Sequence, residues 1–449
     1  MAMDKHFASF LFSVFAIFFS SLSCAVDLSQ AYQDALTQDP SWAAAQARFN
    51  AGKENKTIGL SGLLPTIALT GTDMRTDNSA LPDEYDSSNY AVSLSQPLFN
   101  VSLWYNYKSG NHEATRAQYD FQSDQQDFLY RVANSYFSVL SAQDTLSFSE
   151  AEELALKKQL EQARQRFDVG LVAITDVREA EAAYDESRAN QIIAQKNVDM
   201  AYQSLSALTG TLYDSLATLL PDFPIIEPQP NDMNEWVHHA TESSPRIQSA
   251  KYTAKAAKSN ANIAKGQFFP SLTFDAQRSR AEAPELLLDP GSINTTDATQ
   301  YNTQVGLSLS MPLFTGLGNY SRSKQARYVY EQSNDLYLYQ LRNTTTNTRS
   351  YYLQVVADVA TVEARQLSVV SSKSSLEATE AGYQVGTRNI VDVLNAQRNL
   401  FLSQQTLSDS RYSYILNSLR LKQLAGALEE QDLLQLNDWL AEPAPTADQ

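Results

Sequence analysis

Residues 166–177 read RFDVGLVAITDV and residues 380–394 read EAGYQVGTRNIVDVL, and each stretch places a glycine break between two long segments without glycine or proline. The first break separates residues 111–169 from 171–209, and the second separates 319–381 from 387–425. Because glycine and proline are the strongest interruptions of helices, each break predicts the turn of a long helical hairpin. A run of roughly 60 helical residues would span about 90 Å, which no single globular core requires.

The chain contains two copies of one plan, which is the pattern expected of an internal duplication. Near the start of each copy, Asp39-Pro40 corresponds to Ser244-Pro245 with an offset of 205 residues. From the hairpin turn onward the offset is 216, as for Val169-Gly170 and Val385-Gly386, because the second copy carries a loop insertion. We therefore divide the 449 residues into a secretory signal peptide (1–25), a first repeat (26–229), a second repeat (230–428) and a C-terminal segment and tail (429–449).

The long segments have the apolar spacing of coiled coils. Apolar residues recur three and four positions apart, as in Phe128, Val132, Tyr136, Val139 and Leu140. This spacing gives each helix an apolar seam on an otherwise polar surface.

Each repeat also contains a pair of segments in which apolar and polar residues alternate, at about 65–99 and 270–314, and a polar loop is expected to join the two segments of each pair, at 73–89 and 278–300. Strict alternation predicts strands with one apolar face and one face in water. Four strands cannot close a barrel, and an open sheet edge in lipid would leave backbone groups unpaired. Several chains must therefore share one transmembrane β-barrel; known barrels begin at about eight strands, so two chains suffice and three would give twelve strands. Polar residues would line the interior and apolar residues would face lipid. The polar set is Thr70, Ser93, Ser95, Asp275, Gln277, Ser308 and Ser310, and the apolar set is Ile67, Leu69, Val92, Leu94, Phe274 and Leu307.

The N-terminus predicts export from the cytoplasm. Lys5 precedes an apolar run from Phe7 to Leu22, and small residues follow as in a cleavable leader. Cleavage after Ala25 would remove the only cysteine, Cys24. The alternative is that Cys24 becomes a lipidated N-terminus.

Composition argues against several functions. A formal charge of −17 is unsuited to nucleic acid, which needs a basic surface. The sequence carries no pattern of a zinc protease, a thiol pair, a nucleophile elbow or a phosphate loop. We expect neither enzymatic activity nor a cofactor or metal.

The two quoted stretches resemble the hairpin-tip motifs of the TolC family, the outer-membrane factors of efflux pumps and type I secretion. The resemblance runs from Asp27 to about Leu440. It implies an α+β membrane protein: a homotrimer whose twelve-stranded barrel continues into a long antiparallel α-helical coiled-coil barrel in the periplasm. It also implies an equatorial region built from the segments near Ser215 to Asn231 and the C-terminus, and docking on a periplasmic adaptor and an inner-membrane transporter of the RND, ABC or MFS type.

The resemblance further implies site residues. Adaptor-docking tips map onto Val169, Gly170, Leu171, Val385, Gly386 and Thr387. Polar links that close the tunnel mouth map onto Thr175, Asp176, Tyr383 and Arg388. Asp392 corresponds to a ring of carboxylates that would bind cations at a constriction, and Asn395 stands where the family's type member has a second aspartate.

A soluble periplasmic coiled-coil adaptor is the alternative. It would share long helical hairpins and a leader, but such adaptors usually have one hairpin set, whereas this chain repeats two hairpins and two strand pairs.

Overall fold

The computed structural model describes residues 25–77, 85–289 and 292–441. Nearly all of the predicted leader, including Cys24, and the tail from residue 442 lie outside the described residues. No helix among the described residues has the length and apolar character needed to cross a membrane.

Both halves of the chain contain two short helices, two long strands, two long helices and a short strand in the same order, and the second half adds α9 before its short strand. The first half holds α1 (Leu28–Gln38), α2 (Pro40–Ser61), β1 (Thr66–Thr76), β2 (Tyr85–Phe99), α3 (Val101–Asp168), α4 (Ile174–Thr209) and the short β3 (Thr218–Leu219). The second half holds α5 (Met233–Ser243), α6 (Pro245–Gly266), β4 (Ser271–Asp289), β5 (Ser292–Ser310), α7 (Gly318–Gln384), α8 (Ile390–Ala425), α9 (Glu430–Asn437) and β6 (Leu440–Ala441).

The matching helices have nearly the same lengths. α1 and α5 have 11 residues each, α2 and α6 have 22, α4 and α8 have 36, and α3 and α7 have 68 and 67. At about 1.5 Å per residue, α3 and α7 are each about 100 Å long.

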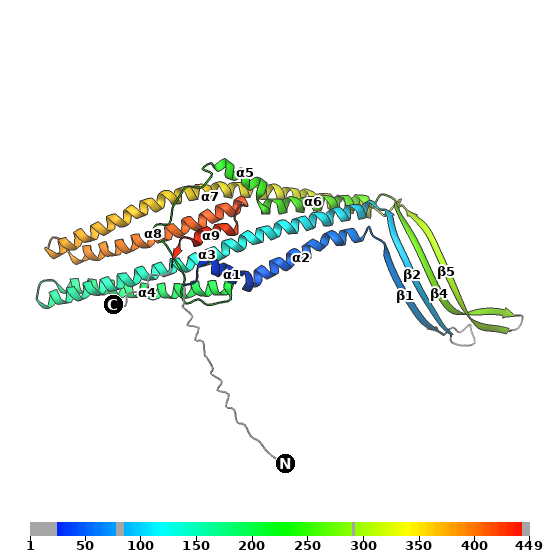
Figure 1. The fold of residues 1–449 in the computed structure, drawn as a ribbon, viewed down its shortest axis with the longest axis horizontal. Coiled ribbons are helices and arrows are strands. Elements are labelled where there is room, and N and C mark those ends of the chain that lie inside the picture. Colours follow the sequence, from blue (N-terminus) through cyan, green and yellow to red (C-terminus); the bar gives the residue numbers. More distant parts are fainter. Residues whose placement is uncertain (1–24, 78–84, 290–291, 442–449) are drawn as a thin grey trace, which may run out of the picture.

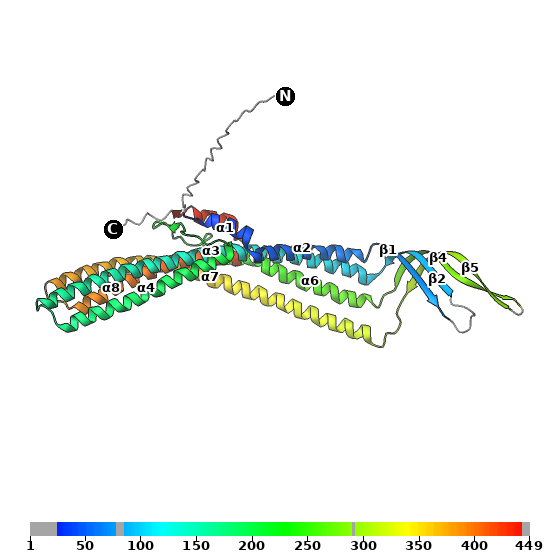
Figure 2. The ribbon, with the colours of Figure 1, turned by 90° about the horizontal axis from the view of Figure 1, so that it is seen from below.

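The molecule is elongated, with the sheet at one end and the turns of the two helical hairpins at the other (Figures 1 and 2). α2, α3, α6 and the first half of α7 form the section beside the sheet. The hairpins α3–α4 and α7–α8 form the opposite section, and α1 and α9 pack near the middle.

The four long strands form one antiparallel sheet in the order β1-β2-β4-β5. Its register pairs apolar residues with apolar ones, for example Leu69 with Val92 and Phe274 with Leu307, and pairs Ser93 with Gln277 and Ser95 with Asp275. Because paired residues share a face, this register confirms that the predicted polar and apolar sets lie on opposite faces.

The strands are longer than the alternation predicted. Residues 73–89 and 278–300 were expected to be polar loops, but β1 runs to Thr76, β2 starts at Tyr85, and β4 and β5 pair as far as Asp289 and Ser292. Ladder hydrogen bonds need only backbone groups, so pairing continues beyond the region with one apolar face.

The main hydrophobic core lies around the middle of the molecule. Its fully buried residues include Phe128, Tyr136 and Phe137 from α3, Leu205 from α4 and Ile415 from α8. The Tyr136 hydroxyl lies 2.8 Å from the carbonyl oxygen of Ala217, its hydrogen-bond acceptor in the segment that follows α4. This ties the 211–231 segment to the helices.

The C-terminus joins the same region. β6 pairs with β3, and Asn437 at the end of α9 accepts from the backbone N–H of Ser29 (3.0 Å) and donates to Asp27 (3.0 Å). The end of α9 is therefore held against the start of α1, and β6 is held against the segment that follows α4.

Beside the sheet, α2 and α3 approach so closely that glycine is required. A Cβ at Gly110 would lie 2.3 Å from the carbonyl oxygen of Asn55, and one at Gly59 would lie 3.0 Å from that of Asn106. Two backbones in contact cannot make room by rotating a side chain.

We predict that Gly110→Ala destabilises the protein by about 1–3 kcal/mol through overpacking. The matched control is Gly306→Ala in β5, where an added Cβ meets nothing within 4 Å. The temperature at which purified protein in detergent loses protease resistance should fall for Gly110→Ala and stay unchanged for Gly306→Ala. Equal behaviour of the two variants would show that the α2–α3 approach is not tight.

Candidate functional site

The two hairpin tips have the same backbone geometry. After α3, Gly170 has φ +75°, its N–H donates to Phe167 (2.9 Å) and that of Leu171 donates to Arg166 (2.8 Å). After α7, Gly386 has φ +79°, its N–H donates to Tyr383 (3.2 Å) and that of Thr387 donates to Gly382 (2.9 Å). This is the Schellman ending, in which a left-handed residue closes the helix and satisfies its last carbonyls. The sequence thus fixes both tips through one glycine each.

The tips present apolar side chains to the surroundings. Val169, Leu171 and Val385 are 69%, 74% and 75% exposed, and a Cβ on either glycine would meet nothing within 4 Å. Exposed aliphatic residues at the ends of two rigid hairpins form a surface suited to another protein.

A second hydrophobic core lies directly behind the tips. It joins α3, α4, α7 and α8, and its fully buried members include Ala163, Ala180, Val393 and Ile390. The small residues allow the helices to approach closely, which makes the tip region a four-helix unit rather than two free hairpins.

The four residues predicted to link the tunnel mouth do not form one network within a single chain. The Thr175 hydroxyl lies 3.3 Å from Asp176, its neighbour in sequence. Arg388 is largely exposed, and its guanidinium lies 3.8 Å from Asp392 on its own helix. No contact between Arg388 and Asp176 is present among the described residues of one chain.

Tyr383 is buried, and its principal neighbour, Arg166, could not be predicted from the spacing of the tip motif. The guanidinium of Arg166 lies 4.5 Å from the centre of its ring, and the Tyr383 hydroxyl has no hydrogen-bond partner within the described residues. Both residues line a cavity of about 340 Å³ between the hairpins, with Gln159, Gln162, Gln165, Glu380, Gln384 and Val393. Arg166 belongs to the tip motif, but nothing in the pattern distinguishes it from a surface cation.

Asp392 has a structural role at the start of α8. Asn389 accepts from the backbone N–H of Asp392 (2.8 Å), and Asp392 accepts from that of Asn389 (3.4 Å). This reciprocal pair is a capping box, which satisfies two of the free N–H groups at a helix start. Asn395 lies one turn further along the helix and is exposed.

Polar contacts connect the two hairpins between the tips and the middle of the molecule. Arg398 on α8 pairs with Glu186 on α4 (2.8 Å), and Tyr412 on α8 donates to Asp144 on α3 (2.9 Å). Burial raises the pKa of the neighbouring Asp409, and the charge of Asp144 raises it further, while a hydrogen bond from Ser141 lowers it. The helices of different hairpins therefore meet through charged and hydroxyl groups, which sequence reasoning did not single out.

Within residues 25–77, 85–289 and 292–441, no group of three or more His, Cys, Asp or Glu side chains is arranged to hold a metal ion.

Comparison with known proteins agrees with this geometry. Residues 31–211 and 236–427 match the model of the family described as "Outer membrane efflux protein". The chain is 34% identical over 419 residues to Outer membrane protein TolC of Vibrio cholerae, covering 93% of this chain and 94% of that protein. It is 35% identical to Outer membrane protein TolC of Escherichia coli K12, covering 95% and 88%. It is 28% identical to the Alkaline protease secretion protein AprF of Pseudomonas aeruginosa, covering 96% and 90%.

The fold is also that of solved structures. The crystal structure of CusC superposes with a TM-score of 0.77 at 18% identity, covering 90% of this chain and 93% of that one. That of VceC from Vibrio cholerae superposes with a TM-score of 0.76 at 20% identity, covering 89% and 96%.

Proposed function

Because the chain belongs to the outer membrane efflux protein family, it is a non-enzymatic exit duct for efflux and type I secretion, and we propose that three copies build it. The protein resides in the outer membrane, and its helices form a tunnel in the periplasm. We infer that the three sheets close a twelve-stranded barrel and that the matched lengths of the two halves reflect an internal duplication. A periplasmic adaptor and an inner-membrane transporter of the RND, ABC or MFS type would complete the passage.

One observation carries the shared barrel. The sheet order β1-β2-β4-β5 leaves one edge of β1 and one edge of β5 without a partner among the described residues, while one face of the sheet is apolar. Unpaired backbone groups in a membrane cost several kcal/mol each, so β5 of one copy and β1 of the next should pair. A soluble periplasmic adaptor would leave the apolar face of this sheet exposed to water, so the sheet favours a membrane protein over that alternative.

We propose that Arg388 closes the tunnel mouth by reaching Asp176 or a hydroxyl on a neighbouring helix. Its side chain is 60% exposed, and its guanidinium has only a long 3.8 Å contact, to Asp392, among the described residues of its own chain, so it has donors to spare. Tyr383 and Thr175 would complete this set of links.

Single-channel recording in planar bilayers tests the duct and its closure together. The native protein should conduct in small steps, and Arg388→Gln should conduct in larger steps because the mouth is released. Arg178→Gln is the control, since Arg178 is an exposed arginine near the start of α4 that pairs with Glu181 (2.6 Å). An absence of conductance in all three proteins would contradict the duct, and equal conductance would contradict only the closure by Arg388.

We propose that Asp392 contributes one carboxylate per copy to a ring that favours cations. Asp392→Asn removes the charge but keeps an oxygen that accepts from Asn389, so the capping box survives. The preference for cations over anions, measured as the reversal potential across a salt gradient, should fall by roughly twofold or more. The control is Asp185→Asn, an exposed carboxylate on α4. A reversal potential that moves equally in both variants would remove Asp392 from the constriction.

We propose that the apolar tips around Gly170 and Gly386 dock the adaptor, through Val169, Leu171, Val385 and Thr387. Gly386→Asp places a carboxylate at the C-terminal end of α7, where the helix dipole is already negative. Docking of the partner would also bury this charge, which costs free energy of binding. Gly386→Asn is the matched control, because asparagine adopts the left-handed conformation and carries no charge. Capture of the adaptor from cells should fall at least tenfold for the aspartate and far less for the asparagine, with both proteins still oligomeric. Full capture by Gly386→Asp would deny this tip a docking role.

A further inference from the structure

Lysines gather in the helical section next to the sheet. Residues 53–61 of α2, 101–116 of α3 and 255–266 of α6 contain seven basic and two acidic residues, although the whole chain carries a formal charge of −17. Six of these basic residues, which we call the lysine belt, are Lys53, Lys56, Lys108, Lys255, Lys258 and Lys265. A local excess of positive charge on an acidic protein indicates an anionic partner.

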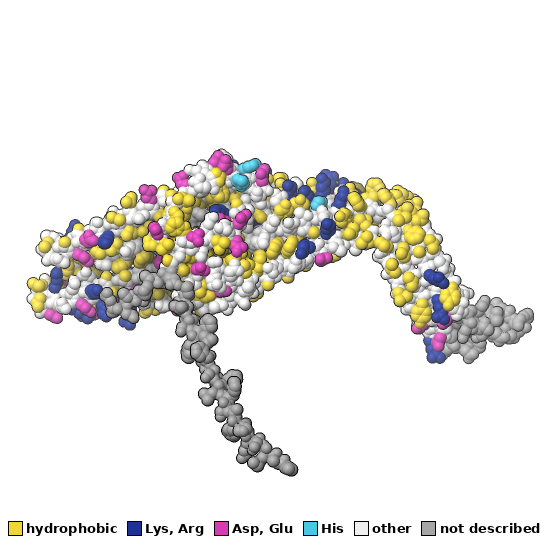
Figure 3. Space-filling model, viewed as in Figure 1, with side chains coloured by type: hydrophobic (Ala, Val, Ile, Leu, Met, Phe, Trp, Pro, Cys, Tyr) yellow, Lys and Arg dark blue, Asp and Glu magenta, His cyan; other side chains and the backbone are white. Residues whose placement is uncertain are grey.

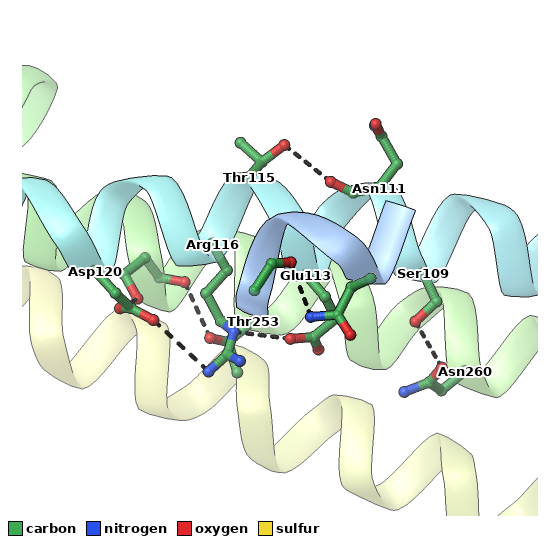
Figure 4. Close-up of polar contacts among 11 residues, drawn as sticks. Ser109, Asn111, Glu113, Thr115, Arg116, Asp120, Thr253 and Asn260 are labelled. Carbon is green, nitrogen blue, oxygen red and sulfur yellow. Dashed lines mark hydrogen bonds and ion pairs between the residues drawn. The ribbon is translucent and has the colours of Figure 1, made fainter. Parts of the chain in front are cut away.

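The lysine belt has no internal counterions. The guanidinium of Arg116, the seventh basic residue, lies 2.8 Å from the carboxylate of Glu113 and 3.8 Å from that of Asp120 (Figure 4). On the same helix, the Ser109 hydroxyl donates to Asn260 of α6. In contrast, no belt lysine forms an ion pair within the described parts of the chain.

Several belt lysines lie over aromatic rings instead. Lys53 lies 4.8 Å from the ring centre of Phe49, Lys108 lies 5.5 Å from that of Trp104, and Lys255 lies 4.3 Å from that of Tyr252. A cation over a ring keeps its charge available to a further anion.

Contacts between α3 and α6 bring basic groups of the two helices together. The ring of His112 on α3 lies 6.0 Å from that of Tyr252 on α6, the ring over which Lys255 lies. Burial lowers the pKa of the His112 imidazole, and the charges of Lys255 and Lys108 lower it further. Figure 3 shows Lys and Arg side chains over α3 and α6, on the same face as the hydrophobic side chains of the sheet.

Their height matches the surface of a membrane that the sheet spans. At about 1.5 Å per helical residue, the Cα atoms of the six belt lysines lie within about 16 Å of the end of their own helix that adjoins the strands. A headgroup layer occupies about 6 Å on each side of the hydrocarbon, and electrostatic attraction reaches about 8–10 Å further at physiological salt. The exposed aromatic residues Trp104, Phe268 and Phe269, at 49%, 43% and 54% exposure, mark the boundary itself.

We propose that the lysine belt binds the anionic headgroups of phospholipids in the periplasmic leaflet and thereby fixes the height of the duct in its membrane. The inference rests on the membrane placement given under Proposed function. Lysine suits this role because its flexible stem carries the ammonium toward the headgroups. Around a trimer, the six lysines of each copy would form a continuous basic ring below the barrel.

Fluorescence quenching by brominated lipids tests the proposal on the full-length protein in vesicles. Of the four tryptophans, Trp42 and Trp236 are buried in the core, and the half-buried Trp439 packs against Phe223 near the middle of the molecule. Trp104 is the exposed tryptophan beside the sheet, so membrane quenching reports on Trp104. Brominated phosphatidylglycerol should quench about three- to fivefold more effectively than brominated phosphatidylcholine at low salt, and the preference should fall at high salt.

Two matched triple variants separate the belt from general charge. Lys56→Gln, Lys258→Gln and Lys265→Gln together should remove most of the preference. Lys157→Gln, Lys158→Gln and Lys196→Gln together remove the same charge from exposed positions far from the sheet and should leave it intact. Equal quenching by both lipids in the native protein would overturn the belt, whereas quenching by neither lipid would overturn the membrane placement itself.

The anionic cell-wall polymer is the competing ligand. If purified sacculi pull down the native protein and not the belt variant, while the lipid preference is the same in both, the belt binds the polymer and the lipid proposal is wrong.

Discussion

The unpaired edges of the four-stranded sheet are the constraint on which the rest of the structure depends. The sheet has an apolar face that requires lipid, and lipid leaves no solvent to satisfy the free backbone groups of β1 and β5. In the barrel that we propose, other copies of the chain supply partners of the right length and register. Joining the sheets in a ring would also arrange the helices that continue from them in a ring. The tunnel would then follow from the closing of the barrel.

The two hydrophobic cores join the helices at two positions along the molecule. The core near the middle contains large aromatic side chains such as Phe128, Tyr136 and Phe137, and it also holds α1, α9 and the segment after α4. The core behind the tips is smaller and relies on residues such as Ala163 and Val393. Between the two cores, the hairpins meet largely through polar groups, which exchange partners at lower cost than packed aromatic rings. The two hairpins are thus held together by apolar packing at both ends of this polar stretch.

Much of this architecture was predictable because its signals are periodic and repeated. Gly170 and Gly386 stand alone in long segments without helix breakers, so the two tips follow directly from the sequence, and alternation assigns the faces of the sheet. The strand ends were predicted too early because polar residues beyond Asp73 and Arg278 lack the apolar alternation, although their backbones still pair. The contact of Arg166 with Tyr383 depends on a distance that no spacing rule supplies. The capping role of Asp392, in contrast, could have been predicted from its position three residues after Asn389. The link expected between Arg388 and Asp176 joins no groups within one chain, and it stays a proposal about neighbouring helices.

The two hairpins have the same lengths but different chemistry at their tips. At the offset of 216 residues, Asn389, which caps α8, corresponds to Ala173, which makes no side-chain cap at the start of α4. Likewise Arg388 corresponds to Val172. The α7–α8 hairpin therefore adds a cation and a capping amide at its tip, where the α3–α4 hairpin has aliphatic side chains, while both hairpins carry a carboxylate at the matched positions Asp392 and Asp176. In the proposed trimer the six tips would alternate between these two kinds, so a partner docking around the ring would meet two different surfaces.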